Sequence, residues 1–238
     1  MAVTLYQTLH LYARRVRCIE QHIVRLDGMA RALFGRAYTP DPKALEREVL
    51  TLAAKERYPD TVSGFVRLEL TETGETHLTP LGTSLYEGYA LRSLHPTTLT
   101  IPYELPLHID CSTAAEAAHD LARCIARRHD ADEAVRVDGE GVCFSLGEAE
   151  LFAFANGELC YSVTPQTVEG QLLVQAAEHL AIRHTLRPIA NNALKQFDEL
   201  LAVDYRGITS IASCDGVRFM SLRAERLAAT MEQLVTAR

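Results

Sequence analysis

Lysine is scarce in this chain of 238 residues. Of its 24 lysines and arginines, only Lys43, Lys55 and Lys195 are lysines. Basic charge as a whole is also in deficit, because 31 acidic residues give a formal net charge of −7. A chain with this balance has no global basic field to hold a phosphate backbone or an anionic membrane surface. We therefore expect neither nucleic acid nor a membrane as its main partner.

Long apolar runs and paired cysteine motifs are absent as well. No stretch of about 18 apolar residues occurs, and the first 20 residues alternate in polarity instead of forming the apolar core of a signal peptide. The six cysteines show neither a CxxC pair nor a repeated spacing, so the pattern indicates free thiols and not a disulfide framework or a zinc site. They are Cys18, Cys111, Cys124, Cys143, Cys160 and Cys214. Free thiols are typical of a reducing compartment, which predicts a cytoplasmic protein.

The short motifs of common enzyme classes are missing. The chain contains no HExxH, no P-loop GxxxxGK[ST], no GxGxxG and no GxSxG. His179 and His184 are five residues apart, so on a helix their directions differ by about 140° and they are poor joint metal ligands. The sequence therefore predicts no metal site.

The length is compatible with one or two domains of ordinary composition. Three prolines fall between His95 and Pro106, and such a stretch favours an extended connector. We therefore predict a small α+β N-terminal domain over residues 1–104 and a larger α+β C-terminal domain over residues 105–238.

Periodicity predicts the elements of the N-terminal part. A period of two over residues 3–12 predicts a strand. An apolar stripe from Ile19 to Leu33 predicts a helix that ends near Gly35, and Pro42 lies in the first turn of a second helix over residues 41–57. Strands are expected around Val66 to Leu70, over residues 85–94 and over residues 98–105.

The C-terminal part mixes helices and strands. A helix is expected to begin near Thr113, with Ala117, Leu121, Cys124 and Ile125 facing inward. Asn156-Gly157 lies between two apolar runs and favours a type I′ hairpin turn. Further helices are expected over residues 168–183 and from residue 221 onward.

The order of several short motifs resembles that of a known family. Tyr6-x-Thr8 is followed by Ile19-x-x-His22-x-x-Arg25-Leu26, then by Asp132-Glu133-Ala134 and by Leu151-Phe152 before the Asn-Gly turn. This order resembles the class IV aminotransferases, the fold-type IV enzymes that use pyridoxal phosphate, which include branched-chain and D-amino acid aminotransferases and aminodeoxychorismate lyase. The resemblance implies a two-domain α+β fold of the D-amino acid aminotransferase type and a homodimer.

The resemblance assigns roles to positions that this chain fills in an unusual way. Arg25 matches the arginine that binds the cofactor phosphate, and a guanidinium suits that role. The Schiff-base lysine should lie within residues 108–111, which read His-Ile-Asp-Cys. The glutamate that pairs with the pyridine nitrogen is replaced by Ser145, and the phosphate-binding threonines by Leu172 and Asp204. A carboxylate at Asp204 would repel a phosphate dianion.

Three hypotheses remain open from the sequence. In the first, the chain has the class IV fold, has lost the catalysis that depends on pyridoxal phosphate, needs no cofactor, and keeps an interdomain cleft for a small anionic ligand or a structural role. In the second, it is an active aminotransferase or lyase with pyridoxal phosphate in an atypical site, where Lys195 substitutes as the Schiff base. In the third, it is an unrelated α+β binding module.

Overall fold

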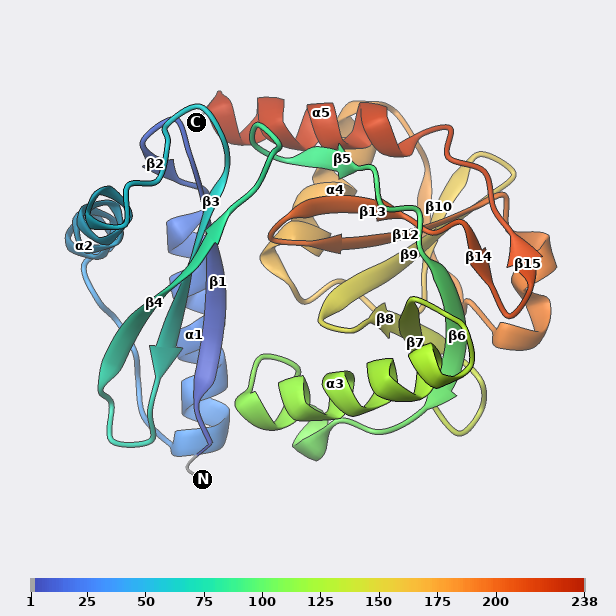
Figure 1. Ribbon diagram of the computed structural model, residues 1–238, viewed down its shortest axis with the longest axis horizontal. Coiled ribbons are helices and arrows are strands. Elements are labelled where there is room, and N and C mark those ends of the chain that lie inside the picture. Colours follow the sequence, from blue (N-terminus) through green and yellow to red (C-terminus); the bar gives the residue numbers. More distant parts are fainter. Residues whose placement is uncertain (1–2, 238) are drawn as a thin grey trace. The chain divides into compact units, whose positions relative to one another are not determined.

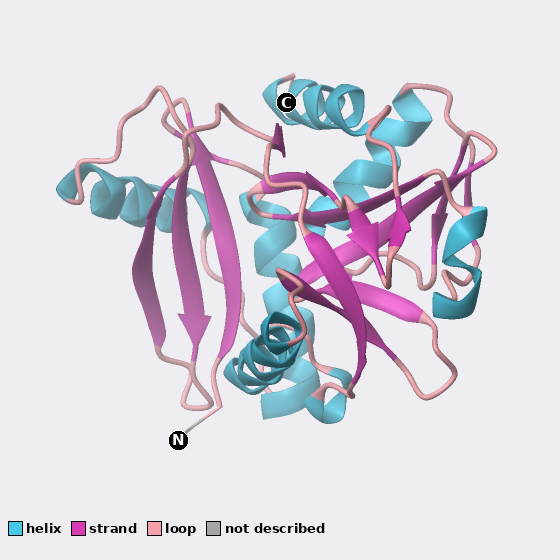
Figure 2. Ribbon diagram, turned by 45° about the vertical axis from the view of Figure 1, so that its right-hand side comes forward, coloured by secondary structure: helices cyan, strands magenta, loops and turns pink. Residues whose placement is uncertain are grey.

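The computed structural model describes residues 3–237, which form two compact units that each contain helices and strands (Figures 1 and 2). The first unit runs up to Gly88 and includes the short segment Cys111–Ala114. The second unit comprises Tyr89–Asp110 and the chain from Ala115 onward. The predicted boundary after residue 104 falls inside the second unit, because two strands before it pair with strands that follow much later in the chain.

The first unit is an antiparallel sheet with two helices. Its strand order is β2-β1-β3-β4, and α1 packs on β1 while α2 packs against β2 (Figure 1). The elements are β1 (Leu5–Tyr12), β2 (Arg15–Val16), α1 (Ile19–Phe34), α2 (Pro42–Lys55), β3 (Gly64–Leu70) and β4 (Thr76–Thr83). The predicted strand and both predicted helices of this part are confirmed.

Local chemistry explains where the two helices begin and end. Gly35 follows α1 with φ +66°, a left-handed conformation that glycine adopts without strain. Asp41 caps α2 by accepting from the backbone N–H groups of Lys43 and Ala44, and Pro42 fills the first helical position. Strand β4 was not predicted, because its residues are mostly exposed and show no apolar alternation.

The second unit is a large mixed sheet with three α-helices. Among the described residues its main path runs β15-β14-β6-β7-β8-β9-β12-β13-β5, with β10 and β11 attached to β9. Its strands are β5 (Ala90–Arg92), β6 (Thr97–Pro102), β7 (Glu133–Val137), β8 (Cys143–Leu146), β9 (Ala149–Ala155), β10 (Glu158–Tyr161), β11 (His184–Leu186), β12 (Glu199–Asp204), β13 (Gly207–Ser210), β14 (Ser213–Cys214) and β15 (Val217–Arg218). Its helices are α3 (Thr113–Arg128), α4 (Val168–His179) and α5 (Ala224–Thr236), with short 3-10 turns η1 (Pro106–His108) and η2 (Asn191–Gln196).

Strand alternation separates the two faces of this sheet. On β9, Leu151 and Ala153 belong to the main apolar core, so Glu150 and Phe152 point to the opposite face. Helices α4 and α5 pack against each other, and α4 also packs on β12. The predicted Asn156-Gly157 turn joins β9 to β10 with positive φ at both residues, as a type I′ turn requires.

Two predictions for the second unit were wrong. Residues 85–89 form bends, so the expected strand over residues 85–94 is reduced to β5. Helix α3 turns its alanine-rich face inward, and Leu121 and Ile125 are exposed at 68% and 46%. The buried face carries Ala115, His119, Ala122 and Ala126, because small side chains let the helix lie close to β6 and β7.

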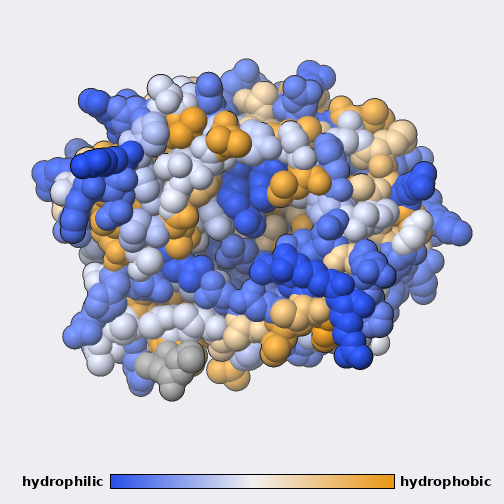
Figure 3. Space-filling view, in the orientation of Figure 1, coloured by the Kyte–Doolittle hydropathy of each residue, from blue (hydrophilic) through white to orange (hydrophobic). Residues whose placement is uncertain are grey.

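Hydrophobic side chains do not gather in one region of the surface that Figure 3 shows, and the cysteines form no disulfide. Hydrophobic and hydrophilic residues are interspersed on the face drawn in Figure 3. Within residues 3–237, no helix combines the length and the apolar character needed to cross a membrane. All six cysteines are free.

Candidate functional site

The second unit contains a cavity of about 550 Å³ between α3, β7, β8 and the loop that leads into α4. This volume lies within the range of about 300–1,000 Å³ that is typical of small-molecule sites. The cavity is lined by Glu104, Leu105, Asp110, His119, Arg136, Asp138, Phe144, Ser145, Gly147, Glu148, Glu150, Val163, Thr164 and Gln166. Ser145, which the sequence assigned to the family site, is therefore a lining residue.

Arg136 brings a guanidinium into this cavity from the middle of β7. Its Nε–H donates to Ser145 Oγ at 3.4 Å, because the two residues stand opposite each other on β7 and β8. The guanidinium carbon lies 4.7 Å from the centre of the Phe144 ring, so the aromatic face holds the plane of the group. Among the described residues, its two terminal nitrogens have no hydrogen-bond or ion-pair partner.

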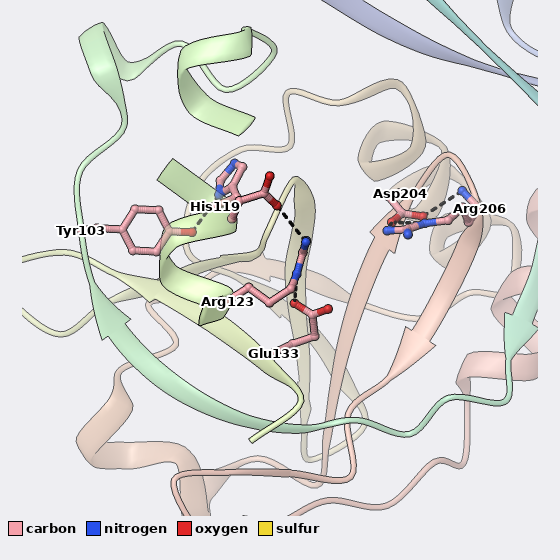
Figure 4. Close-up of polar contacts among 7 residues, drawn as sticks. Tyr103, His119, Arg123, Glu133, Asp204 and Arg206 are labelled. Atoms are coloured by element: carbon pink, nitrogen blue, oxygen red, sulfur yellow. Dashed lines mark hydrogen bonds and ion pairs between the residues drawn. The ribbon is translucent and has the colours of Figure 1, made fainter. Parts of the chain in front are cut away.

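His119 reaches the cavity from the inward face of α3 and is only 5% exposed. Its Nδ1 lies 2.8 Å from the Tyr103 hydroxyl, and burial raises the pKa of that phenol to about 12 (Figure 4). Burial, together with the nearby Arg136 charge, lowers the pKa of His119 to about 4, so the imidazole is neutral at pH 7. Its Nε2 has no hydrogen-bond partner within residues 3–237.

Arg123 fastens α3 to the sheet beside this cavity. It donates to Asp120 on its own helix and to Glu133 at the start of β7, at 2.8 Å in each case (Figure 4). These bonds set the position of α3, and therefore of His119, relative to β7 and Arg136.

Most of the carboxylates that line the cavity already have partners. Asp138 accepts from the backbone N–H groups of Glu140 and Val142 in the turn after β7. Asp110 and Glu148 also interact with other groups of the chain. These carboxylates are therefore not all available to a ligand.

Glu150 closes the N-terminus of α4. Its Oε1 accepts from the backbone N–H groups of Gln166 (2.6 Å) and Thr167 (3.1 Å), and its Oε2 accepts from the Thr167 hydroxyl (2.7 Å). Thr167 in turn caps the helix by accepting from the Gly170 N–H at 2.9 Å. A Cβ at Gly170 would overlap Glu150 Oε2, so this contact requires a glycine. The carboxylate thus occupies the place at a helix N-terminus that suits an anion.

Asp204 lies at the end of β12 and is not one of the residues that line the cavity. It is buried and pairs with Arg206, whose backbone N–H and guanidinium both donate to it across the tight turn into β13 (Figure 4). This pair raises the pKa of Arg206, chiefly through the charge of Asp204. Asp204 therefore has a partner inside the second unit, and a role for it in a ligand site remains a prediction.

Arg25 belongs to the first unit and lies on α1 among buried polar groups. Its Nη1 donates to Gln7 Oε1 at 3.4 Å, and His22 Nδ1 lies 3.1 Å from the same oxygen. Burial, followed by the charge of Arg25, lowers the pKa of His22 to about 3. A cofactor-phosphate role for Arg25 remains a prediction.

Substituting Arg25 with alanine should raise the pKa of His22 while leaving it below that of a free imidazole. The charge of Arg25 is the second cause of the shift, and burial, the larger cause, is unchanged. NMR titration of the His22 ring in the variant and the parent protein measures this. A His22 pKa that stays the same or falls in the variant would contradict the assignment.

Lys195 lies on η2 with an exposed side chain and does not line the cavity. Lys43 and Lys55 both lie on α2 of the first unit. The segment in which the resemblance placed the Schiff-base lysine contributes Asp110 to the cavity, and Cys111 is buried in the first unit.

Arg136, His119 and Glu150 were not predicted as functional residues from the sequence. One feature of the sequence could have indicated Arg136. It lies inside the apolar strand Ala134-Val135-Arg136-Val137, where an unpaired charge is unusual. His119 gave no such signal, because the predicted inward face of its helix was wrong.

With this geometry in place, comparisons with known proteins decide the family. The family model for amino-transferase class IV matches residues 4–214. The chain belongs to the class IV aminotransferase family. No curated protein matches it.

Solved structures of class IV enzymes share the fold. A branched-chain aminotransferase from Thermoproteus uzoniensis superposes with a TM-score of 0.80 at 15% identity, covering 98% of this chain and 86% of that one. A putative 4-amino-4-deoxychorismate lyase from Legionella pneumophila gives 0.80 at 14%, covering 97% and 90%. A Brucella abortus aminotransferase bound to pyridoxal phosphate gives 0.81 at 13%, covering 98% and 89%. The predicted two-domain class IV fold is confirmed, and the unrelated binding module is excluded.

Proposed function

We propose that this class IV family member does not carry out catalysis with pyridoxal phosphate and uses the cavity of its second unit to bind a small anionic ligand. The observation that carries the proposal is the position of Glu150. Its carboxylate accepts from the amides and the hydroxyl at the start of α4. In the family this helix start is where the cofactor phosphate is expected, so an internal anion already fills the place of the phosphate.

The donor set does not fit the cofactor in other respects. No lysine lines the cavity, and Asp110 enters it from the segment that should supply the Schiff base. Ser145 offers a hydroxyl where the family has a carboxylate for the pyridine nitrogen, and a serine cannot hold that nitrogen protonated. The resemblance also expects a phosphate-binding threonine at Asp204, which is instead a buried carboxylate paired with Arg206. We therefore derive no step through pyridoxal phosphate.

Two further properties belong to the same proposal. We expect a homodimer, on the strength of the family resemblance. We also expect a cytoplasmic protein, which the six free cysteines support.

Addition of pyridoxal phosphate to the purified protein should produce neither a saturable visible absorption band nor a saturable borohydride-fixed adduct of one cofactor per chain. No lysine lines the cavity to form the imine, and the carboxylate of Glu150 repels the phosphate. Absorption spectra and intact-protein mass spectrometry after reduction measure both outcomes. The thermal unfolding midpoint should also stay constant, because a ligand that binds the native state raises it.

Two controls make this experiment decisive. The branched-chain aminotransferase of Escherichia coli, treated in parallel, serves as the positive control for colour and adduct. Lys195→Arg removes the one lysine of the second unit and keeps its charge. A saturable adduct with one cofactor per chain that disappears in Lys195→Arg would establish the active-enzyme alternative instead.

A further inference from the structure

We propose that the cavity of the second unit binds a small monocarboxylate through Arg136, His119 and Ser145. The proposal rests on the proposed function in one respect, since the cavity must be free of the cofactor. It is carried by a separate observation, the unmet hydrogen-bonding capacity of Arg136 and His119.

The groups of Arg136 and His119 that lack a hydrogen-bond partner are mainly donors. Both terminal nitrogens of Arg136 are without a partner among the described residues, although the guanidinium is half-buried. Burial lowers the pKa of Arg136, a sign that its charge is poorly solvated. The two terminal nitrogens are not among the buried partnerless atoms of the described residues, so they are accessible to water in the cavity. A ligand that brings acceptor oxygens would take the place of water at these donors.

The geometry of Arg136 favours a planar acceptor. Phe144 covers one face of the guanidinium, so the N–H groups in its plane remain the edge that a ligand can reach. A carboxylate matches this edge with two parallel hydrogen bonds. Ser145 accepts from Nε of Arg136, which leaves its own hydroxyl proton for a ligand oxygen.

His119 supplies a further polar group beside Arg136. The residue lines the cavity, and its Nε2 is buried and has no partner within residues 3–237. The Tyr103 hydroxyl keeps its proton at pH 7 and lies 2.8 Å from Nδ1. When that hydroxyl donates to Nδ1, the neutral imidazole carries its proton on Nε2 and donates to the ligand.

The remaining lining limits the charge of the ligand. The acidic side chains Glu104, Asp110, Asp138, Glu148 and Glu150 surround Arg136, which is the one basic side chain of the lining. A phosphate dianion meets this negative surround with twice the charge of a carboxylate, so the repulsion it feels is about twice as large. The cavity therefore selects a monoanion over inorganic phosphate.

Benzoate and acetate are suitable probes because each has a single carboxylate and no other ionisable group. Isothermal titration calorimetry at pH 8, where inorganic phosphate is mostly the dianion, and at constant ionic strength should show saturable binding of at least one of them to the parent protein, and weaker binding of inorganic phosphate. Arg136→Gln should weaken this binding by about tenfold or more, since it removes a bidentate charge-assisted contact. Arg136→Lys should also weaken it, because an ammonium lacks the planar fork.

The matched control is Arg218→Gln, which removes an exposed strand arginine outside the cavity and should leave binding unchanged. Circular dichroism without ligand establishes that each variant is folded. If Arg136→Gln does not fold, Ser145→Ala tests the same site and should weaken binding about threefold, the loss of one ordinary hydrogen bond.

Three outcomes would overturn the proposal. They are no saturable carboxylate binding to the folded parent protein, equal binding by the Arg136 and Arg218 variants, and phosphate binding as strong as that of the carboxylates. A cofactor adduct in the pyridoxal phosphate experiment counts against the proposed function. Absence of both adduct and carboxylate binding counts against the carboxylate site alone.

Discussion

Replacing Glu199 with alanine should lower the free energy of unfolding of the second unit by about 3–5 kcal/mol. Glu199 begins β12 and is 0% exposed. Its Oε1 accepts from Arg223 Nη1 at 2.6 Å, and its Oε2 accepts from the backbone N–H groups of Leu222 and Arg223 at 2.7 and 2.9 Å. One buried carboxylate therefore satisfies three donors just before α5.

The size of this effect follows from what the substitution leaves behind. Removal of the carboxylate leaves Arg223, which is packed over the Phe154 ring, without its counter-charge. It also leaves two backbone N–H groups at the start of α5 without their acceptor. Removing one partner of a buried pair is strongly destabilising for this reason, even where the intact pair adds little net stability.

Urea denaturation followed by circular dichroism measures the change. Glu225→Ala is the matched control, because Glu225 is an exposed carboxylate in the first turn of α5 and should cost no more than about 1 kcal/mol. Glu199→Gln should fall between the two, since its amide oxygen still accepts one or two of the bonds. A Glu199→Ala effect no larger than that of the control would contradict this account of α5.

Acidification from pH 6.5 to 4.5 should destabilise each unit by about 2 kcal/mol through one buried histidine, because the unfolded imidazole is already half protonated at pH 6.5 and the slope reaches about 1.36 kcal/mol per pH unit only below it. Burial lowers the pKa of His22 in the first unit to about 3 and that of His119 in the second to about 4, from a value of 6.5 in the unfolded chain. Below pH 6.5 the unfolded chain therefore binds a proton that the folded unit does not. Stability is complete above pH 6.5 and falls as the pH drops toward the folded pKa.

The slope of stability against pH is the quantity to measure, because His119→Gln and His22→Gln also change packing. In this pH range the unfolded parent chain binds about one more proton per buried histidine than the folded chain. Each of these two variants should reduce that difference by about one proton. His77→Gln, which replaces an exposed histidine on β4, is the control. Asp27 and Asp132, whose pKa values are lowered from 3.8, titrate below the chosen range. Identical slopes in all three variants would contradict the role of the buried imidazoles.

Glu150 and Glu199 make similar contacts in the second unit. Each carboxylate stands on a central strand, on the face that carries α4 and α5, and accepts from backbone N–H groups at or just before the start of one of these helices. Under the proposed function, the carboxylate of Glu150 takes the place of a ligand phosphate, so the same contacts would serve both the stability of the unit and its function.

Much of the fold follows from short stretches of sequence. The period-two strand β1, the cap at Asp41, the left-handed Gly35 and the Asn156-Gly157 turn each depend on a few neighbouring residues, so local rules predict them. The scarcity of lysine is likewise a property of the sequence, which contains no lysine between positions 55 and 195 whatever the fold.

The tertiary structure alone decided the rest. The inward face of α3 was mispredicted because close packing on β6 and β7 selected alanines over the larger Leu121 and Ile125. The cavity joins residues from 104 to 166 that meet only after the strands have paired. Hydrophobic periodicity reports which residues are buried, but it carries no information on which buried polar group meets which. The partnerless nitrogens of Arg136 and His119 therefore became visible only once the sheet and α3 were in place.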